Sequence, residues 1–344
     1  MATIRDVANE AHVSIATVSR VIKKSGAVSE DTKKNVYAAI EKLNYMPPSA
    51  ARKLATADNT SLLVLFPNTL KSIHSETMEG IKDSAKQNDI MLYYAMCEND
   101  HQRETAYVNA FKRGQFSGII FMGTFLQANE LNTLSKTHNI ALCGENVESA
   151  NVLSFVIDFE KAAYEAVSHL ISCGHKKIAM ITTHRRVWSS VFKENGYRRA
   201  FKEHGLPYED EYIFFGRFGI GNARYIVNYF ESLDVPPTAY FCISDDIARS
   251  VANVLLERNY NFGTDIAICG FDDSEASTSA YPLLTTISQP FYDLGYKVVE
   301  VLSKNVSSAV EHKEITYMEH KLFIRESTGA PPVNTHAEDI PNRQ

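Results

Sequence analysis

From residue 61 onward, short apolar runs alternate with amphipathic stretches, and this alternation restricts the fold more than any other feature of the chain. Strands and helices that alternate many times require parallel sheets with helices on both faces. We expect about ten strands, at residues 62–66, 90–96, 117–122, 140–143, 155–157, 177–182, 212–215, 239–243, 266–269 and 285–287. Helical periodicity fills the gaps, for example at residues 75–87, 160–173, 190–204 and 247–258. Ten strands exceed one compact doubly wound sheet, so we predict two α/β subdomains.

The last elements of the α/β region indicate where its two subdomains begin and end. A helix at residues 291–303 and a strand at 317–324 follow the second half and should cross back to the first. The core would then span residues 60–330, with an N-terminal subdomain (about 60–158 and 290–318) and a C-terminal subdomain (about 159–289 and 319–330). Residues 331–344 are polar and contain proline, so we predict a disordered tail.

The expected compartment is the cytoplasm. No apolar run approaches the roughly 18 residues that a membrane helix needs. The first ten residues contain acids and lack the apolar stretch of a secretion signal. The five cysteines lie far apart, which is typical of reduced core thiols rather than of disulfides or a zinc site. We expect neither a metal nor a cofactor.

The first 58 residues are basic, although the whole chain carries a net charge of −6. They hold nine lysines and arginines against six acids, so the remainder carries −9. Thr3, Ser14 and Ser29 are each placed to cap a short helix, and Thr3 with Asp6 can form a capping box. Two short helices joined by a tight turn and supported by a third make a helix-turn-helix domain, which we assign to residues 1–46.

The second of these helices would present small and hydroxyl side chains outward. Val18, Val21 and Ile22 form its expected buried stripe. The outward positions hold Ile15, Ala16, Thr17, Ser19 and Arg20. A purely solvated helix would carry glutamate and lysine there, so this face favours insertion into a DNA major groove over a helical cap without a ligand.

The run TIRDVANEAHVSIATVSRVI, followed by VSEDTKKNVYAAIEKLNYMP, resembles the head of the lactose-repressor (LacI/GalR) family of transcription regulators. Within that family it is nearer to the catabolite control protein branch. The resemblance implies direct base readout by Ile15, Ala16 and Arg20, with Thr17 and Ser19 on phosphates. The family usually has asparagine where Lys23 and Pro48 stand, which affects only the finer backbone contacts.

Residues 47–59 are expected to form a hinge helix and linker. Two prolines end the third helix, and the segment that follows is too short to be a stable helix alone, so a plain linker is the simpler interpretation from the residues. In the family the same segment folds on the operator. The resemblance makes Leu54 a wedge in the minor groove, with Ser49 and Arg52 as further DNA contacts.

Two acidic pairs, Asp245-Asp246 and Asp272-Asp273, directly follow expected strands. Open α/β sheets bind ligands at the carboxyl ends of their strands, so these acids can accept hydrogen bonds from ligand hydroxyls, and Asp272 is the best candidate. Helix capping is the alternative, above all for Asp246. The chain has no P-loop and no HExxH motif, and the acids have no nucleophile or histidine partner. We therefore expect no enzyme.

The resemblance continues through FVIDFEKAA, SCGHKKIAMI, NGYRRAF, PTAYFCISDDIA, AICGFDDSE and YPLLTTISQP. It implies a type I periplasmic-binding-protein-like core with an effector in the cleft between the subdomains. We predict that this effector is a sugar or sugar derivative. Lys193 stands where sugar-responsive relatives have a ligand-clamping arginine, and Trp188 can stack on a sugar face. The expected effector-binding residues are Asp272, Lys193, Trp188, Asp245, Ile73 and Asp158. Arg185 and Arg186 leave open an effector that bears a phosphate or carboxylate.

These features predict a homodimeric transcription regulator, most often a repressor, that binds palindromic operator DNA and responds to a small effector. Apolar residues at 75–87 and 291–303, including Tyr292, Tyr296, Val299 and Leu302, exceed what one core face needs. Packing inside the subdomain accounts for about half of them, and we expect the dimer to form through this side. The alternative is a global catabolite regulator controlled by a phosphorylated phosphocarrier protein, because QPFYDLGYKVVEVL resembles the docking surface for such a partner. Glu300 stands at a position that is basic in that branch, and it would repel a phosphoserine.

Overall fold

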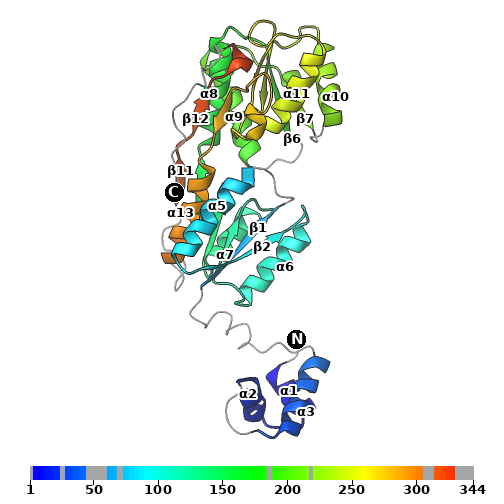
Figure 1. Cartoon of the computed structure of the whole chain (residues 1–344), viewed down its shortest axis with the longest axis vertical. Coiled ribbons are helices and arrows are strands. Elements are labelled where there is room, and N and C mark those ends of the chain that lie inside the picture. Colours follow the sequence, from blue (N-terminus) through cyan, green and yellow to red (C-terminus); the bar gives the residue numbers. More distant parts are fainter. Residues whose placement is uncertain are drawn as a thin grey trace.

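The computed structural model describes residues 3–23, 28–43, 60–67, 73–183, 188–216, 220–304 and 314–329. Within them the chain forms a helical head and two α/β subdomains, each with its own parallel sheet (Figure 1). The predicted architecture, a head of three short helices and a core of two α/β subdomains with parallel sheets, is confirmed. The expected hinge at 47–59 and the tail at 331–344 lie outside the described residues. None of the described helices is long and apolar enough to cross a membrane.

Three helices form the head: α1 (Ile4–Glu10), α2 (Ile15–Lys23) and α3 (Glu30–Lys42). Their N-termini are capped as the sequence predicts, because Thr3 and Asp6 form a capping box, and Ser14 and Ser29 accept the N–H of the residue three positions later. One small apolar cluster holds the helices together, and it consists of Val7, Ala8, Ala11, Val18, Val21, Val36 and Ala39.

The N-terminal sheet has six parallel strands in the order β11-β5-β4-β3-β1-β2. The strands are β1 (Ser61–Phe66), β2 (Met91–Met96), β3 (Gly118–Phe121), β4 (Ile140–Cys143), β5 (Leu153–Ile157) and β11 (Ile315–Met318). Every residue of β1 is buried, and successive side chains enter different cores. Val64 joins the cluster with α5 (Ile73–Gln87) and α13 (Phe291–Lys304), while Leu63 joins the one with α6 (His101–Lys112) and α7 (Ala128–Ser135).

The C-terminal sheet has four parallel strands in the order β7-β6-β8-β9. Its strands are β6 (Ile178–Thr183), β7 (Ile213–Gly216), β8 (Ala239–Cys242) and β9 (Ala267–Cys269). One face packs on α8 (Phe159–Ser172) and α9 (Trp188–Glu203), and the other on α10 (Ile220–Glu231) and α11 (Asp245–Glu257). The shorter elements are η1 (Asp210–Tyr212), α12 (Glu275–Thr278) and η2 (Glu326–Thr328).

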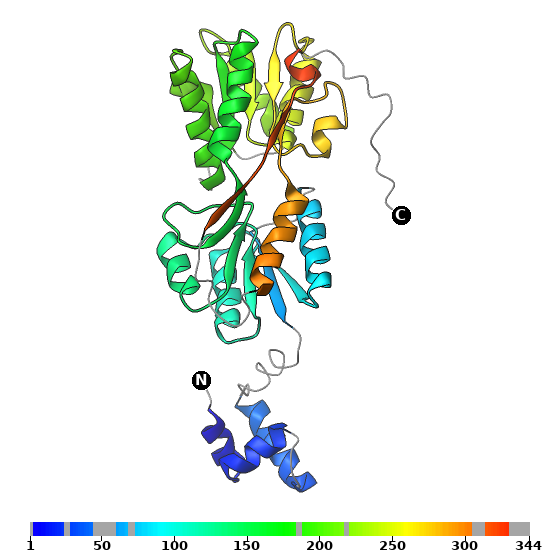
Figure 2. The same cartoon turned by 90° about the vertical axis from the view of Figure 1, so that its left-hand side faces the viewer.

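The chain passes between the subdomains at residues 157–159, 288–291 and 318–321, as Figure 2 shows. The segment expected as one strand at 317–324 divides at the last of these crossings. Its first part belongs to β11, which pairs with β5, while β12 (Lys321–Phe323) pairs antiparallel with β10 (Thr286–Ser288). The two parts pair in different sheets, and Glu319 and His320 separate them.

The apolar residues of α13 that were assigned to the dimer side pack within the N-terminal subdomain. Val299 and Leu302 are completely buried in the core of the N-terminal subdomain. Tyr292 and Tyr296 donate hydrogen bonds from their hydroxyls to Asp83 and Gln87 of α5. These residues thus bind α13 to its neighbour within the subdomain, because α5 and α13 cross in close contact.

Two glycines permit that crossing. A Cβ on Gly80 would lie 2.0 Å from the carbonyl oxygen of Tyr292, and a Cβ on Gly295 would lie 2.1 Å from that of Thr77. Both obstacles are backbone atoms of the facing helix, so neither can move aside without separating the helices. The crossing therefore requires the absence of a side chain at both positions.

We expect Gly80→Ala to destabilise the protein by about 3 kcal/mol, because the added methyl group forces α5 and α13 apart. Thermal melting of the full-length protein measures this as a drop of several degrees. Lys82→Ala is the control, since Lys82 is exposed on the same helix and its replacement should cost less than about 0.5 kcal/mol. Equal melting temperatures for Gly80→Ala and wild type would contradict the proposed packing.

Candidate functional site

Helix α2 of the head presents a face of small and polar side chains to solvent. Val18 and Val21 turn inward and are buried, so the opposite side of the helix must face outward. Ile15, Ala16 and Arg20 are exposed, and Thr17 and Ser19 are half-buried. The Thr17 hydroxyl lies 2.9 Å from that of Ser14, the N-terminal cap.

This face has the chemistry for a DNA groove. An exposed isoleucine on a short helix can contact a thymine methyl group, and an arginine can donate two hydrogen bonds to guanine. The remaining expected DNA contacts, Ser49, Arg52 and Leu54, lie outside the described residues.

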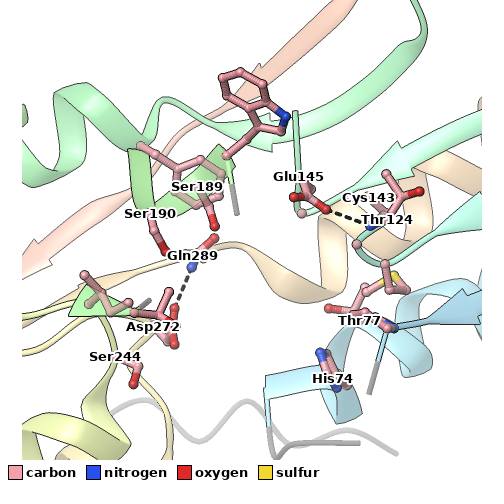
Figure 3. A pocket seen from close by; sticks show the side chains of 18 of the residues that line it. His74, Thr77, Thr124, Cys143, Glu145, Ser189, Ser190, Ser244, Asp272 and Gln289 are labelled. Atoms are coloured by element: carbon pink, nitrogen blue, oxygen red, sulfur yellow. Dashed lines mark hydrogen bonds between the residues drawn. The ribbon is translucent and has the colours of Figure 1, made fainter. Parts of the chain in front are cut away.

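A cavity of about 720 Å³ lies between the two subdomains (Figure 3). Both subdomains supply its walls, and most wall residues lie at or just beyond the carboxyl ends of strands. The polar and aromatic lining consists of His74, Thr77, Asn99, Thr124, Phe125, Gln127, Glu145, Phe159, Thr183, Trp188, Ser189, Ser190, Lys193, Ser244, Asp272, Gln289 and Phe291. This size and mixture suit a small polar ligand.

Asp272 is the main acid of the C-terminal wall. It follows β9, and its carboxylate accepts a hydrogen bond of 2.7 Å from the side-chain amide of Gln289. Its backbone has φ = +108°, a conformation that costs energy in a residue with a Cβ. The N–H of Asp272 donates to the carbonyl of Ile287 at 2.8 Å, which fixes this conformation and directs the side chain to the cavity.

Lys193 and Trp188 reach the same cavity from α9. The ammonium group of Lys193 donates to the carbonyl of Ile243 at 3.0 Å and lies 3.6 Å from the ring centroid of Phe271. This cation–π contact stabilises a charge that is largely removed from water. The structure thus brings three of the predicted residues, Asp272, Lys193 and Trp188, together in one cavity.

Asp245 and Asp158, which the sequence also predicts as effector-binding residues, do not line the cavity. Asp158 caps α8 by accepting the N–H of Lys161. Asp245 is completely buried and accepts from the N–H of Ser274 at 2.7 Å and the hydroxyl of Thr286 at 2.6 Å.

Both positions follow strands as ligand-binding residues do, but local packing turns these two side chains away. Burial raises the pKa of Asp245 to about 8, and the negative charge of Asp272 adds to the shift. Ile73, the last of the predicted effector-binding residues, is the first residue of α5, and its side chain lies outside the part of the chain that the structure describes. The segment with Arg185 and Arg186 is also outside the described residues.

The N-terminal wall holds an acid that the sequence-based reasoning missed. Glu145 follows β4, is 6% exposed, and accepts the N–H of Thr124 at 3.0 Å (Figure 3). The hydroxyl of Thr124 in turn donates to Glu104, another buried acid, at 2.6 Å. The sequence does contain a signal for Glu145, namely its position directly after an expected strand. It follows the strand at 140–143 just as Asp272 follows the one at 266–269.

The family models and the relatives agree on both parts of the chain. Residues 3–48 match the model for bacterial regulatory proteins of the lacI family, and residues 167–328 match the periplasmic binding protein-like domain. Catabolite control protein A of Priestia megaterium is 34% identical over 95% of this chain and 99% of its own length. The transcriptional repressor PurR of Aliivibrio salmonicida is 29% identical over 95% of this chain and 99% of its own.

Solved structures give the same result. The lac repressor dimer, bound to operator and the anti-inducer ONPF, is 25% identical and superimposes with a TM-score of 0.70. The similarity covers 96% of this chain and 99% of that one. It therefore extends over head and core together.

We expect Asp245→Asn to change how stability depends on pH. The folded protein keeps a proton on Asp245 up to about pH 8, whereas the unfolded chain releases it near the ordinary value of 3.8, so folding loses stability as pH rises between these values. The stability of Asp245→Asn relative to wild type should therefore increase by roughly 1 kcal/mol per pH unit between pH 5.5 and 7.5. Melting curves across this range measure it, and a constant difference would contradict the assignment.

Proposed function

The chain belongs to the lacI family of bacterial regulatory proteins, which are DNA-binding transcription regulators and not enzymes, and we propose that it is a cytoplasmic repressor controlled by a small carbohydrate. The observation that carries this proposal is the cavity with walls from both subdomains. A ligand that contacts both walls binds one relative placement of the subdomains better than another. Differential affinity of this kind is what allows a ligand to shift a two-state equilibrium.

The head supplies the DNA-binding surface in this proposal. Ile15, Ala16 and Arg20 are assigned to base edges, and Thr17 and Ser19 to phosphates. The hinge residues Ser49, Arg52 and Leu54 complete the set, with Leu54 as the minor-groove wedge. The proposed operator is a near-palindrome, because a two-fold dimer presents two identical heads.

The proposed homodimer forms beside β2. This strand is an edge of the N-terminal sheet, and its Met91, Tyr94 and Met96 are each more than 40% exposed. Exposed apolar side chains on an unpaired edge strand are unfavourable in a monomer and are covered in a dimer. Helix α5 flanks this edge, so the interface includes its exposed side.

The proposed effector is a sugar or sugar derivative. Asp272 accepts from its hydroxyls, Lys193 donates to its oxygens, and Trp188 with Phe159 offers aromatic walls for a sugar ring. Since lysine has no planar fork, it cannot clamp two neighbouring hydroxyls as arginine does. We therefore assign most of the ligand specificity to the carboxylate.

A phosphorylated phosphocarrier protein is the alternative controlling partner, and the sequence similarity to catabolite control protein A favours it. On α13, however, Phe291 faces the cavity and the hydroxyl of Tyr292 bonds to Asp83. Glu300 accepts from Lys297 and Lys304, which lower its pKa to about 2, so it is ionised and repels a phosphate. An operator-binding assay with a sugar or with the phosphorylated partner separates the two candidates.

We expect Arg20→Ala to weaken binding to the specific operator by about 1–3 kcal/mol, roughly 5- to 150-fold, because one base contact is lost. Binding to random DNA should fall much less. Lys34→Ala, an exposed residue of α3, is the control for the loss of one positive charge. Gel-shift titration on palindromic and random duplexes measures both, and it should show two chains per operator. Equal losses on the two duplexes would refute base readout by Arg20.

We expect neutral sugars to raise the melting temperature in a panel with sugar phosphates, uronates and nucleobases. A ligand at 100 times its Kd stabilises the folded state by about 2.7 kcal/mol. Asp272→Ala should abolish this shift, whereas Asp246→Ala, an exposed neighbour of the other acidic pair, should preserve it. The assignment is wrong if nucleobases alone stabilise the protein, or if Asp272→Ala retains the full shift.

A further inference from the structure

The turn that carries Asp272 has an unfavourable backbone conformation. Asp272 and Asp273 are consecutive, and both have a positive φ, +108° and +53°, although neither is a glycine. A side chain makes these conformations costly, so they persist only where the surrounding structure fixes them. Contacts from outside the turn must therefore hold it.

Arg325 supplies such a contact. Its guanidinium group donates to the carboxylate of Asp273 at 2.7 Å. It also donates to the hydroxyl of Ser277 at 3.1 Å and to the carbonyl oxygen of Leu284 at 2.9 Å. The side chains of Arg325 and Asp273 are only 16% and 19% exposed, so salt in the solvent screens their attraction little. A planar group with five N–H donors can serve these three acceptors at once.

Arg325 is itself firmly placed. It lies between β12 and η2, and its backbone N–H donates to the hydroxyl oxygen of Thr285 at 2.8 Å. In η2, the hydroxyl of Ser327 is buried and donates to the carbonyl oxygen of Ile268 in β9 at 2.6 Å. These bonds fix the segment that carries Arg325 against the C-terminal sheet, so its side chain can act as an anchor for the turn.

Two backbone N–H groups report on whether the turn is closed. The N–H of Asp272 donates to the carbonyl of Ile287 at 2.8 Å, and that of Ser274 donates to the carboxylate of Asp245 at 2.7 Å. Both bonds must break before these hydrogens exchange with solvent. Since the acceptors of these two bonds belong to other residues, faster exchange after a change at Arg325 measures opening of the turn.

We propose that Arg325 is a positioning residue of the cavity: through Asp273 it holds the turn in the conformation that directs the Asp272 carboxylate to the ligand. The two acids of the pair then have different roles, because Asp272 lines the cavity and Asp273 anchors the backbone behind it. The effect on a ligand rests on the proposed function, since it takes Asp272 as the acceptor of sugar hydroxyls. The hold on the turn is measurable without a ligand.

The experiment measures amide hydrogen exchange of the full-length protein, by mass spectrometry of peptides that cover residues 270–276. Arg325→Gln should accelerate exchange there by about tenfold or more, because the turn loses a charged partner. Arg325→Lys should have a smaller effect, since an ammonium group can bond to Asp273 but cannot also reach the other two acceptors. The lysine variant also guards against a glutamine variant that fails to fold.

Arg249→Gln is the matched control. The guanidinium group of Arg249 also makes three hydrogen bonds, to the carbonyl oxygens of Ala276, Tyr281 and Pro282, which all lie outside the turn. Its loss should lower the melting temperature, as the loss of Arg325 does. Exchange of the turn should nevertheless stay within about twofold of wild type, because a local opening depends only on the contacts that it breaks. A purely structural role of Arg325 would not produce this difference.

Asp273→Asn tests the other partner of the ion pair. It should also accelerate exchange of the turn, and adding it to Arg325→Gln should change the rate by no more than about twofold, because both variants remove the same contact. A neutral sugar that raises the melting temperature of wild type should bind Arg325→Gln about threefold or more weakly, since the competent turn is then less populated. Arg249→Gln should keep the wild-type affinity.

The proposal is overturned if Arg325→Gln leaves exchange of the turn unchanged, or if Arg249→Gln accelerates it equally. It is also overturned if a sugar binds Arg325→Gln as tightly as it binds wild type. A sugar panel without any hit would refute the proposed effector class, and hydrogen exchange would still confirm or refute the hold of Arg325 on the turn. The two failures are therefore distinguishable.

Discussion

All strands of a parallel sheet end at the same edge, and in this protein two such edges face one cavity. Residues that follow β1, β3, β4, β8, β9 and β10 therefore supply much of its lining, although they are far apart in the sequence. The strands themselves must be buried on both faces, which requires a layer of helices on each side. The ligand-binding groups follow from this packing, because only the ends of the strands remain free to carry polar side chains.

The sequence predicts the local features of the fold well and the direction of individual side chains less well. The helix caps Thr3, Ser14 and Ser29 are found as expected, because capping depends on residues three positions apart. Asp245 and Asp272 have the same pattern in the sequence, but Asp245 lies at the start of α11 and turns inward to Ser274 and Thr286. Only the packing of the surrounding loops distinguishes them. The direction of the apolar side chains of α13 also depends on packing, because α13 crosses α5 in close contact at two glycines.

Buried carboxyl groups of both subdomains give the cavity its chemical character. Asp272 is held by Gln289, and Glu145 by the backbone N–H of Thr124, so each acid has a partner before any ligand binds. Such groups are pre-organised, and a ligand gains affinity because little reordering is needed. The sequence-based reasoning missed Glu145, because a single acid after a short strand has no second member to mark it.

The central claim is that occupancy of the cavity and binding of operator DNA are coupled. Coupling between two sites is reciprocal, so a ligand must change operator affinity by the same factor by which operator changes ligand affinity. The direct measurement is a pair of titrations on full-length protein: operator with and without saturating ligand, and ligand with and without saturating operator. The account predicts equal factors of roughly 5- to 150-fold in both directions, corresponding to a coupling free energy of about 1–3 kcal/mol. A ligand that fills the cavity but leaves operator affinity unchanged would contradict it.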